Sequence, residues 1–141
     1  MALFEKILVP FDGSEYSIWA LGKAVRIAKK VGGEITLIHV YSIKRTAITP
    51  LQVYKYAQAM RKHGKGILED GKKKAEAEGV QVQTLLVDGH TVKQILKAVK
   101  KGNFSLVVIG ARGTSKIRGL LMGSVSEAVT RLAPCPVLVV R

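Results

Sequence analysis

Glycine and serine residues with a fixed spacing mark the stretch of this chain that could bind a phosphate group. Gly110 and Gly113 are followed, nine residues later, by Gly123 and Ser124. The apolar run Phe104 to Ile109 before them is too short for a typical helix, and its β-branched residues favour a buried strand. A strand, a glycine-spaced loop and a helix N-terminus together bind phosphate, because backbone N–H groups and the helix dipole attract an anion and glycine lets it approach closely.

The loop between this strand and the next helix is long. It runs from Gly110 to Met122, whereas ordinary strand-to-helix connections have about two to six residues, and long ordered loops are usually functional. The sequence from Ser124 to Glu127 fits a capping box, so Ser124 is predicted to be the N-cap, with its backbone N–H left for a ligand. Arg112, between two glycines, is the best candidate for charge pairing with phosphate, although a solvated loop would have the same residue.

Strands and helices alternate along the chain. The hydrophobic patterns predict strands at 5–10, 34–41, 80–87, 104–109 and 136–140, separated by helices at 15–31, 53–78, 91–102 and 124–132. This order predicts an α/β fold, an open, doubly wound five-stranded parallel sheet with helices on both faces. Ligands of such sheets bind beyond the carboxyl ends of the strands, where the winding direction reverses. Pro10, Asp12, Val40 and the glycine loop lie at those ends.

Two details of the helices are open to structural test. Thr91 to Gln94 fit a second capping box, which predicts Thr91 as the N-cap of the third helix. Three glycines, Gly64, Gly66 and Gly71, interrupt the helical pattern of the second helix at a cost of about 1 kcal/mol each relative to alanine. We expect this helix to be bent or packed closely against a neighbour there.

The composition bounds the class of protein. The chain has 141 residues and a formal net charge of +13, which suits one domain, 1–141, and an anionic partner. The basic residues are spread over every predicted helix, and no basic run is interleaved with aromatic residues, so nucleic acid is an unlikely partner. No apolar run is long enough for a membrane span, and Met1 to Glu5 lack a signal pattern. We therefore expect a cytoplasmic protein without a membrane partner.

The sequence contains no recognisable set of catalytic residues. His39 lies in an apolar run and fits a core or cleft residue, whereas His63, His90 and Cys135 lack the spacing of metal ligands. The phosphate-loop pattern that ends in Gly-Lys-Ser/Thr is absent, and no residue is assigned to orient water for hydrolysis. The sequence predicts neither a metal site nor catalytic residues.

Four segments together resemble the universal stress protein family over nearly the whole chain. They are the spacing of Gly110, Gly113 and Gly123-Ser124, the opening Ile7 to Ser14, the pair His39-Val40, and the close Ala133 to Val140. The spacing resembles the nucleotide-binding motif of the ATP-binding branch of that family. The resemblance implies a Rossmann-like, adenine nucleotide alpha hydrolase-like domain that forms a homodimer through its last strand, here Val137 to Val140.

The resemblance also implies roles for individual residues. Asp12 would contact the ribose, although Asp12 and Ser14 also fit a simple turn. Val40 would meet adenine through its backbone, next to Pro10. The residues that would hold the phosphates are Gly110, Arg112, Gly113, Gly123, Ser124 and Val125. ATP is then the expected ligand, and Mg²⁺ would arrive only with the nucleotide.

Three functions remain open from the sequence. The leading hypothesis is an ATP-binding regulatory or stress-response module with slow or no hydrolysis. The second is a weak ATPase or phosphotransfer protein that uses Ser124, Thr114 or Ser115. The third is a nucleotide-free scaffold whose positive charge binds an anionic partner.

Overall fold

A computed structural model describes residues 3–43, 49–113 and 122–141. Five parallel strands form one sheet in the order β3-β2-β1-β4-β5. The strands are β1 (Lys6–Pro10), β2 (Glu34–Tyr41), β3 (Val82–Asp88), β4 (Leu106–Gly110) and β5 (Val137–Val140). The helices are α1 (Glu15–Val31), α2 (Pro50–Glu76), α3 (Thr91–Gly102) and α4 (Ser124–Leu132).

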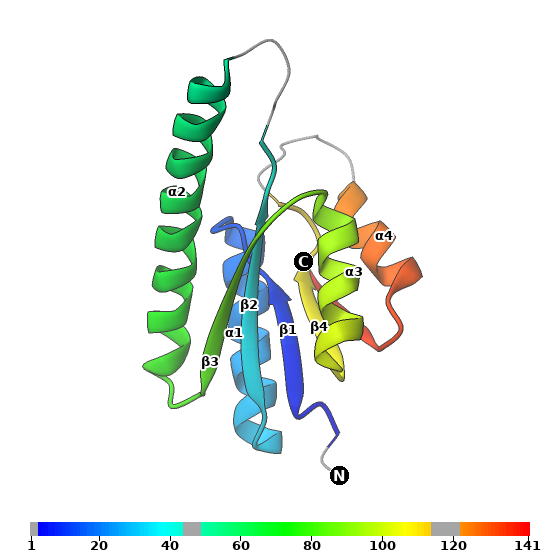
Figure 1. The fold of residues 1–141 in the computed structure, drawn as a ribbon. Helices are drawn as coiled ribbons and strands as arrows, with labels where there is room; N and C mark the ends of the chain where they lie inside the picture. Colours follow the sequence, from blue (N-terminus) through cyan, green and yellow to red (C-terminus); the bar gives the residue numbers. More distant parts are fainter. Residues whose placement is uncertain (1–2, 44–48, 114–121) are drawn as a thin grey trace.

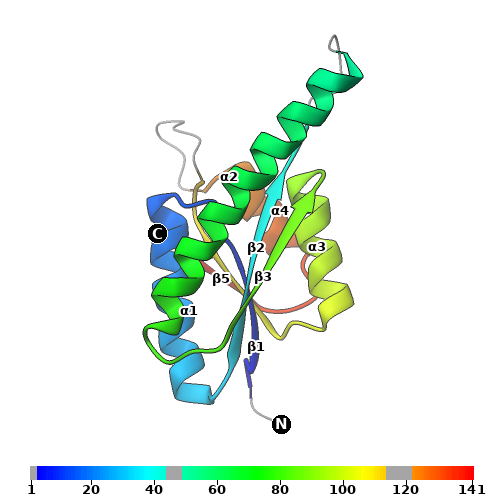
Figure 2. The same cartoon turned by 60° about the vertical axis from the view of Figure 1, so that its left-hand side comes forward.

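The helices cover both faces of the sheet, α1 and α2 on one and α3 and α4 on the other (Figures 1 and 2). Strand residues point alternately to the two sides. Ile7 and Val9 of β1 therefore belong to the core under α1 and α2, whereas Leu8 between them belongs to the core under α3 and α4. The predicted open, doubly wound five-stranded parallel sheet is confirmed.

Helix α1 shows how the sequence sets an element's limits. The Ser14 side chain accepts a hydrogen bond from the Ser17 amide at the N-terminus, and Gly32 ends the helix with a φ of 71°. That left-handed conformation favours glycine. Because both caps are strong, the predicted limits of this helix match the structure.

Helix α2 begins earlier than the predicted residue 53. Thr49 is its N-cap and forms a capping box with Gln52, and Pro50 occupies the first turn. Two of its glycines allow close packing: a Cβ at Gly64 would lie 2.7 Å from Leu86 Cδ1, and one at Gly71 would lie 2.8 Å from Phe11 Cε2. The expected close packing is confirmed at these two positions.

The N-cap of α3 is His90, not Thr91, so this detail of the prediction is wrong. The His90 side chain accepts a hydrogen bond from the Lys93 amide, and Thr91 is already the first helical residue. Threonine can be the N-cap of a helix or its first helical residue, and the sequence alone does not show which of the two positions Thr91 occupies.

Candidate functional site

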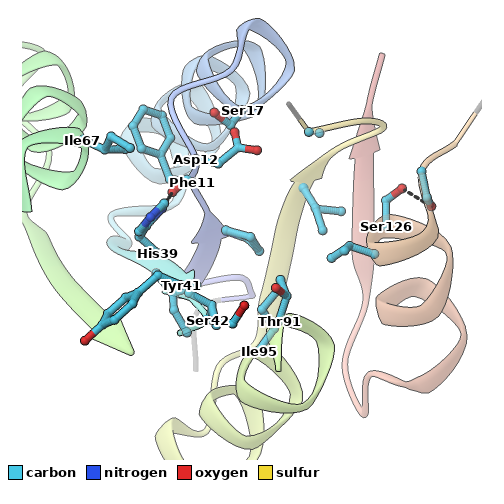
Figure 3. Close-up of a pocket in the computed structure, with 18 of the residues that line it drawn as sticks. Phe11, Asp12, Ser17, His39, Tyr41, Ser42, Ile67, Thr91, Ile95 and Ser126 are labelled. Atoms are coloured by element: carbon cyan, nitrogen blue, oxygen red, sulfur yellow. Dashed lines mark hydrogen bonds between the residues drawn. The ribbon is translucent and has the colours of Figure 1, made fainter. Parts of the chain in front are cut away.

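A cavity of about 620 Å³ opens at the carboxyl ends of the central strands (Figure 3). Strands β1 and β4 are neighbours at the centre of the sheet, and the chain winds away from them in opposite directions, so this is the switch point of the fold. Nine predicted site residues line this cavity: Pro10, Asp12, Val40, Gly110, Arg112, Gly113, Gly123, Ser124 and Val125.

The N-terminus of α4 forms one wall of the cavity. Its N-cap is Gly123, which has no side chain to cap the helix, and Ser124 is the first helical residue. The prediction that the Ser124 hydroxyl caps the helix is therefore wrong. Because the first amides of a helix have no acceptor within the helix, those of Ser124 and Val125 remain available, and the dipole favours an anion there. This wall can bind a phosphate group.

An added side chain would meet different surroundings at the three glycines of the motif. A Cβ at Gly110 would lie 2.8 Å from the backbone of Tyr16, so Gly110 allows α1 to pack against β4. A Cβ at Gly113 would lie 2.7 Å from Asp12 Oδ2. A Cβ at Gly123 would have only ordinary contacts, the nearest being Ala111 O at 3.5 Å. Of these three glycines, only Gly123 lacks a steric reason from the described protein atoms, which favours close approach of a ligand.

Asp12 makes the turn considered from the sequence, and its carboxylate also lines the cavity. Its Oδ1 accepts a hydrogen bond of 3.0 Å from the Ser14 amide, which makes a turn after β1. Its other oxygen, Oδ2, lies beside Gly113, in the lining of the cavity. The turn therefore fixes a carboxylate between the strand ends and the glycine loop.

The wall formed by β1, β2, β4 and α3 is mostly apolar. Val40 packs against the core on the α3 side, as do Ile38, Ile95 and Ile109, and all four line the cavity. Apolar walls with a few placed polar groups are typical of small-molecule sites. This wall suits an aromatic base, and the N-terminus of α4 lines the same cavity.

Comparison with known proteins decides the family. A family model described as "Universal stress protein family" matches residues 3–141. The chain belongs to the universal stress protein family. Universal stress protein YxiE of Bacillus subtilis (strain 168) is 37% identical to it over 148 residues, which cover 99% of this chain and 100% of YxiE. The suspected resemblance is thus confirmed.

Solved structures of the family share the fold. Universal stress protein UspA from Lactobacillus plantarum has a TM-score of 0.88 at 26% identity, with 100% of both chains covered. A universal stress protein solved in complex with cAMP has a TM-score of 0.77 with 99% of both chains covered. At 24% identity, the second likeness shows the fold alone.

Sequence reasoning missed the part of the cavity formed by α2. Tyr56, Met60, His63 and Ile67 line it, at spacings of four, three and four residues. Such spacings place the four side chains on one face of a helix, and this was the available signal. Periodicity alone does not show how far α2 extends past the sheet, so it does not place this face over the strand ends.

Two residues named from the sequence lie outside the described residues, and two kinds of feature are absent from the residues that are described. Thr114 and Ser115 fall outside the described ranges. Among the residues that the structure describes, no three His, Cys, Asp or Glu side chains are grouped to hold a metal ion. No helix in those ranges has the length and hydropathy that a membrane span requires.

Proposed function

We propose that this cavity binds an adenine nucleotide, ATP by preference, and that its occupancy regulates what the protein binds. The observation that carries the proposal is the uncapped N-terminus of α4 in the same cavity as an apolar wall and a fixed carboxylate. Those three features suit a phosphate, a base and a ribose in turn. One protein of the same fold has been solved in complex with cAMP, which is an adenine nucleotide.

The proposal assigns each part of the ligand to its wall. Adenine lies against Pro10 and the backbone of Val40, and the ribose hydroxyls donate to Asp12. The phosphates lie at the α4 N-terminus and the glycine loop, held by Gly110, Arg112, Gly113, Gly123, Ser124 and Val125. A Mg²⁺ ion would be held mainly by the phosphates themselves, since no group of three metal-ligating side chains occurs in the described chain.

Slow or no hydrolysis is part of the proposal. Asp12 is the only carboxylate among the described residues that line the cavity. One of its oxygens already accepts a hydrogen bond from the Ser14 amide. Hydrolysis requires a group that orients the attacking water. Asp12 at the ribose would be badly placed for that task.

We further propose a homodimer through β5. This strand is an edge of the sheet, and Leu138 on it is 40% exposed. Natural proteins usually cover an apolar edge strand. We also propose that the protein is cytoplasmic, because ATP is abundant in the cytoplasm. Size measurement by light scattering at low and high protein concentration tests the dimer.

Nucleotide release and turnover test the function. The purified protein is denatured, and any released nucleotide is identified by mass; an adenine nucleotide at a substantial fraction of one per chain supports the proposal. Single-turnover assays with radiolabelled ATP then separate binding from hydrolysis, because a binding module returns intact ATP. Rapid conversion to ADP would favour the weak ATPase instead. No nucleotide, together with no binding at millimolar ATP, would contradict the proposal.

A further inference from the structure

The cavity has a second half that the nucleotide proposal does not use. The ends of β1 and β2 divide it, because successive strand residues face opposite sides of the sheet. Val40 faces α3, whereas His39 and Tyr41 face α2: His39 lies against Gly64 of α2, and the Tyr41 hydroxyl accepts a hydrogen bond of 3.1 Å from Arg61. Figure 3 shows His39 and Tyr41 on the side away from α3.

Helix α2 supplies the outer wall of this half. Tyr56, Met60, His63 and Ile67 form the stripe that lines the cavity. The first fully buried residue of α2 is Gly64, so Tyr56 and Met60 lie on turns that project beyond the part packed on the sheet (Figure 2). Core packing therefore does not explain an aromatic ring and a thioether at these two positions.

A hydrogen-bond acceptor lies on the inner wall. His39 Nδ1 is 2.9 Å from the carbonyl oxygen of Phe11. Because a carbonyl oxygen only accepts, Nδ1 carries the proton, and Nε2 of the neutral ring is an acceptor. In the described chain no buried side-chain nitrogen or oxygen lacks a partner, and Nε2 makes no hydrogen bond there. This nitrogen is therefore not fully buried, and His39 is one of the residues that line the cavity.

Close packing fixes the position of that imidazole. A Cβ at Gly64 would lie 2.9 Å from His39 Cδ2 and 3.4 Å from Nε2, so α2 rests against the edge of the ring that carries the acceptor. The Phe11 carbonyl holds Nδ1. A side chain fixed in this way presents its free acceptor in one direction, which is what a selective binding site requires.

The chemistry of this half suits a flat, uncharged ring. The rings of Phe11, Tyr41 and Tyr56 and the thioether of Met60 are groups that pack on aromatic faces. None of the described side chains that line this half is a carboxylate, which favours a neutral ring over an organic cation. We propose that this half is a second binding site, for a small planar aromatic molecule whose O–H or N–H group donates to His39 Nε2, and that it is filled independently of the nucleotide.

Binding of 2-naphthol tests the site, because this probe is planar and has one O–H donor. Calorimetry is carried out on the full chain with and without saturating ATP. The expected result is one molecule per chain, with a dissociation constant that ATP changes by less than threefold. The matched probe 2-methoxynaphthalene has the same rings without the donor, and it is expected to bind at least fivefold more weakly.

Two variants on the projecting turns of α2 locate the site. Tyr56→Ala is expected to weaken 2-naphthol at least tenfold and to leave ATP affinity within twofold. Leu51→Ala is the control, since Leu51 is 61% exposed on the same turns and does not line the cavity. Both residues are exposed, Tyr56 by 43%, so neither change threatens folding.

Several results would overturn the second site. Competition between ATP and 2-naphthol would show that the two ligands share one site. Equal 2-naphthol affinity in Tyr56→Ala and Leu51→Ala, or no saturable binding of 2-naphthol, would show that α2 forms no such site. The two proposals fail separately: 2-naphthol binding that is lost in Tyr56→Ala, in a protein that does not bind ATP, would contradict the nucleotide proposal alone.

Discussion

The hydroxyl of Ser126 donates a hydrogen bond of 2.7 Å to the backbone oxygen of Ala111. Ser126 is in the first turn of α4 and is 2% exposed, and Ala111 directly follows β4. The Gly123 amide donates to the same oxygen, at 2.6 Å. These bonds join the two ends of the glycine motif, so the helix N-terminus is held at a fixed place beside the end of β4.

Replacing Ser126 tests whether this link positions the phosphate site. Ser126→Ala is expected to lower the free energy of unfolding by about 1 kcal/mol, because the hydrogen bond from the hydroxyl is lost. The loss is limited because the Ala111 carbonyl oxygen still accepts a hydrogen bond from the Gly123 amide. ATP affinity is expected to fall threefold to tenfold. Denaturant unfolding and calorimetry measure the two effects.

Thr130→Ala is the control for that change. It removes a hydrogen bond of 2.7 Å to the Ser126 carbonyl within α4 and leaves the link to Ala111 intact. Stability is expected to change slightly, with ATP affinity unchanged. Equal losses of ATP affinity in the two variants would mean that Ser126 acts only through the stability of the helix.

The glycines of α2 are expected to respond in opposite ways to alanine. Gly66→Ala should raise the free energy of unfolding by about 0.5 to 1 kcal/mol, because nothing lies within 4 Å of the new Cβ and alanine favours a helix. Gly71→Ala should lower it by about 1 to 3 kcal/mol, because the new Cβ meets Phe11 and Leu37. Urea unfolding of both variants measures this. Stabilisation by both would mean that α2 does not pack on the sheet as described.

Gly110 is expected to be required for folding rather than only for a ligand. Gly110→Ala places a Cβ 2.8 Å from the Tyr16 backbone, which cannot move like a flexible side chain. The free energy of unfolding should fall by about 2 to 3 kcal/mol without any nucleotide present. Thermal unfolding checks this, and normal stability with weakened ATP binding would instead indicate a role in binding alone.

The Cys135 thiol is expected to react slowly at neutral pH. Burial raises its pKa above the ordinary value of 9.0, and a backbone hydrogen bond with Val107 lowers it by less. Because the folded state favours the neutral thiol, its contribution to stability is complete below the unfolded pKa and is lost as pH rises through the folded pKa. The rate of iodoacetamide labelling, compared with free cysteine between pH 7 and about 10, measures this. Faster labelling than free cysteine would contradict a raised pKa.

The sequence predicted the fold because local signals agreed with the long-range pattern. Lys29 and Lys30 before Gly32 marked the end of α1, and the predicted limits of β2 also match the structure. The strand ends could be placed at one edge because parallel strands joined by helices leave no alternative. The nine predicted residues meet in one cavity for that reason.

Other features depend on geometry that a residue pattern does not contain. Ser124 and Thr91 are good N-cap residues, but in both cases the residue before them has the extended backbone of the cap. The side of the cavity formed by Tyr56 and Met60 depends on how far α2 projects past the sheet, which the packing of Gly64 decides. Neither relation can be obtained from composition or periodicity.

Calorimetric titration of ATP into the parent protein, Gly123→Val and Gly22→Val tests whether the N-terminus of α4 binds the nucleotide. Gly123 has an extended backbone that valine tolerates, and Gly22 is an exposed helical position with nothing within 4 Å of an added Cβ. We expect a submillimolar dissociation constant for the parent and Gly22→Val, and at least tenfold weaker binding by Gly123→Val with its fold intact. Equal ATP affinity in all three proteins, or no binding by the parent, would contradict this expectation.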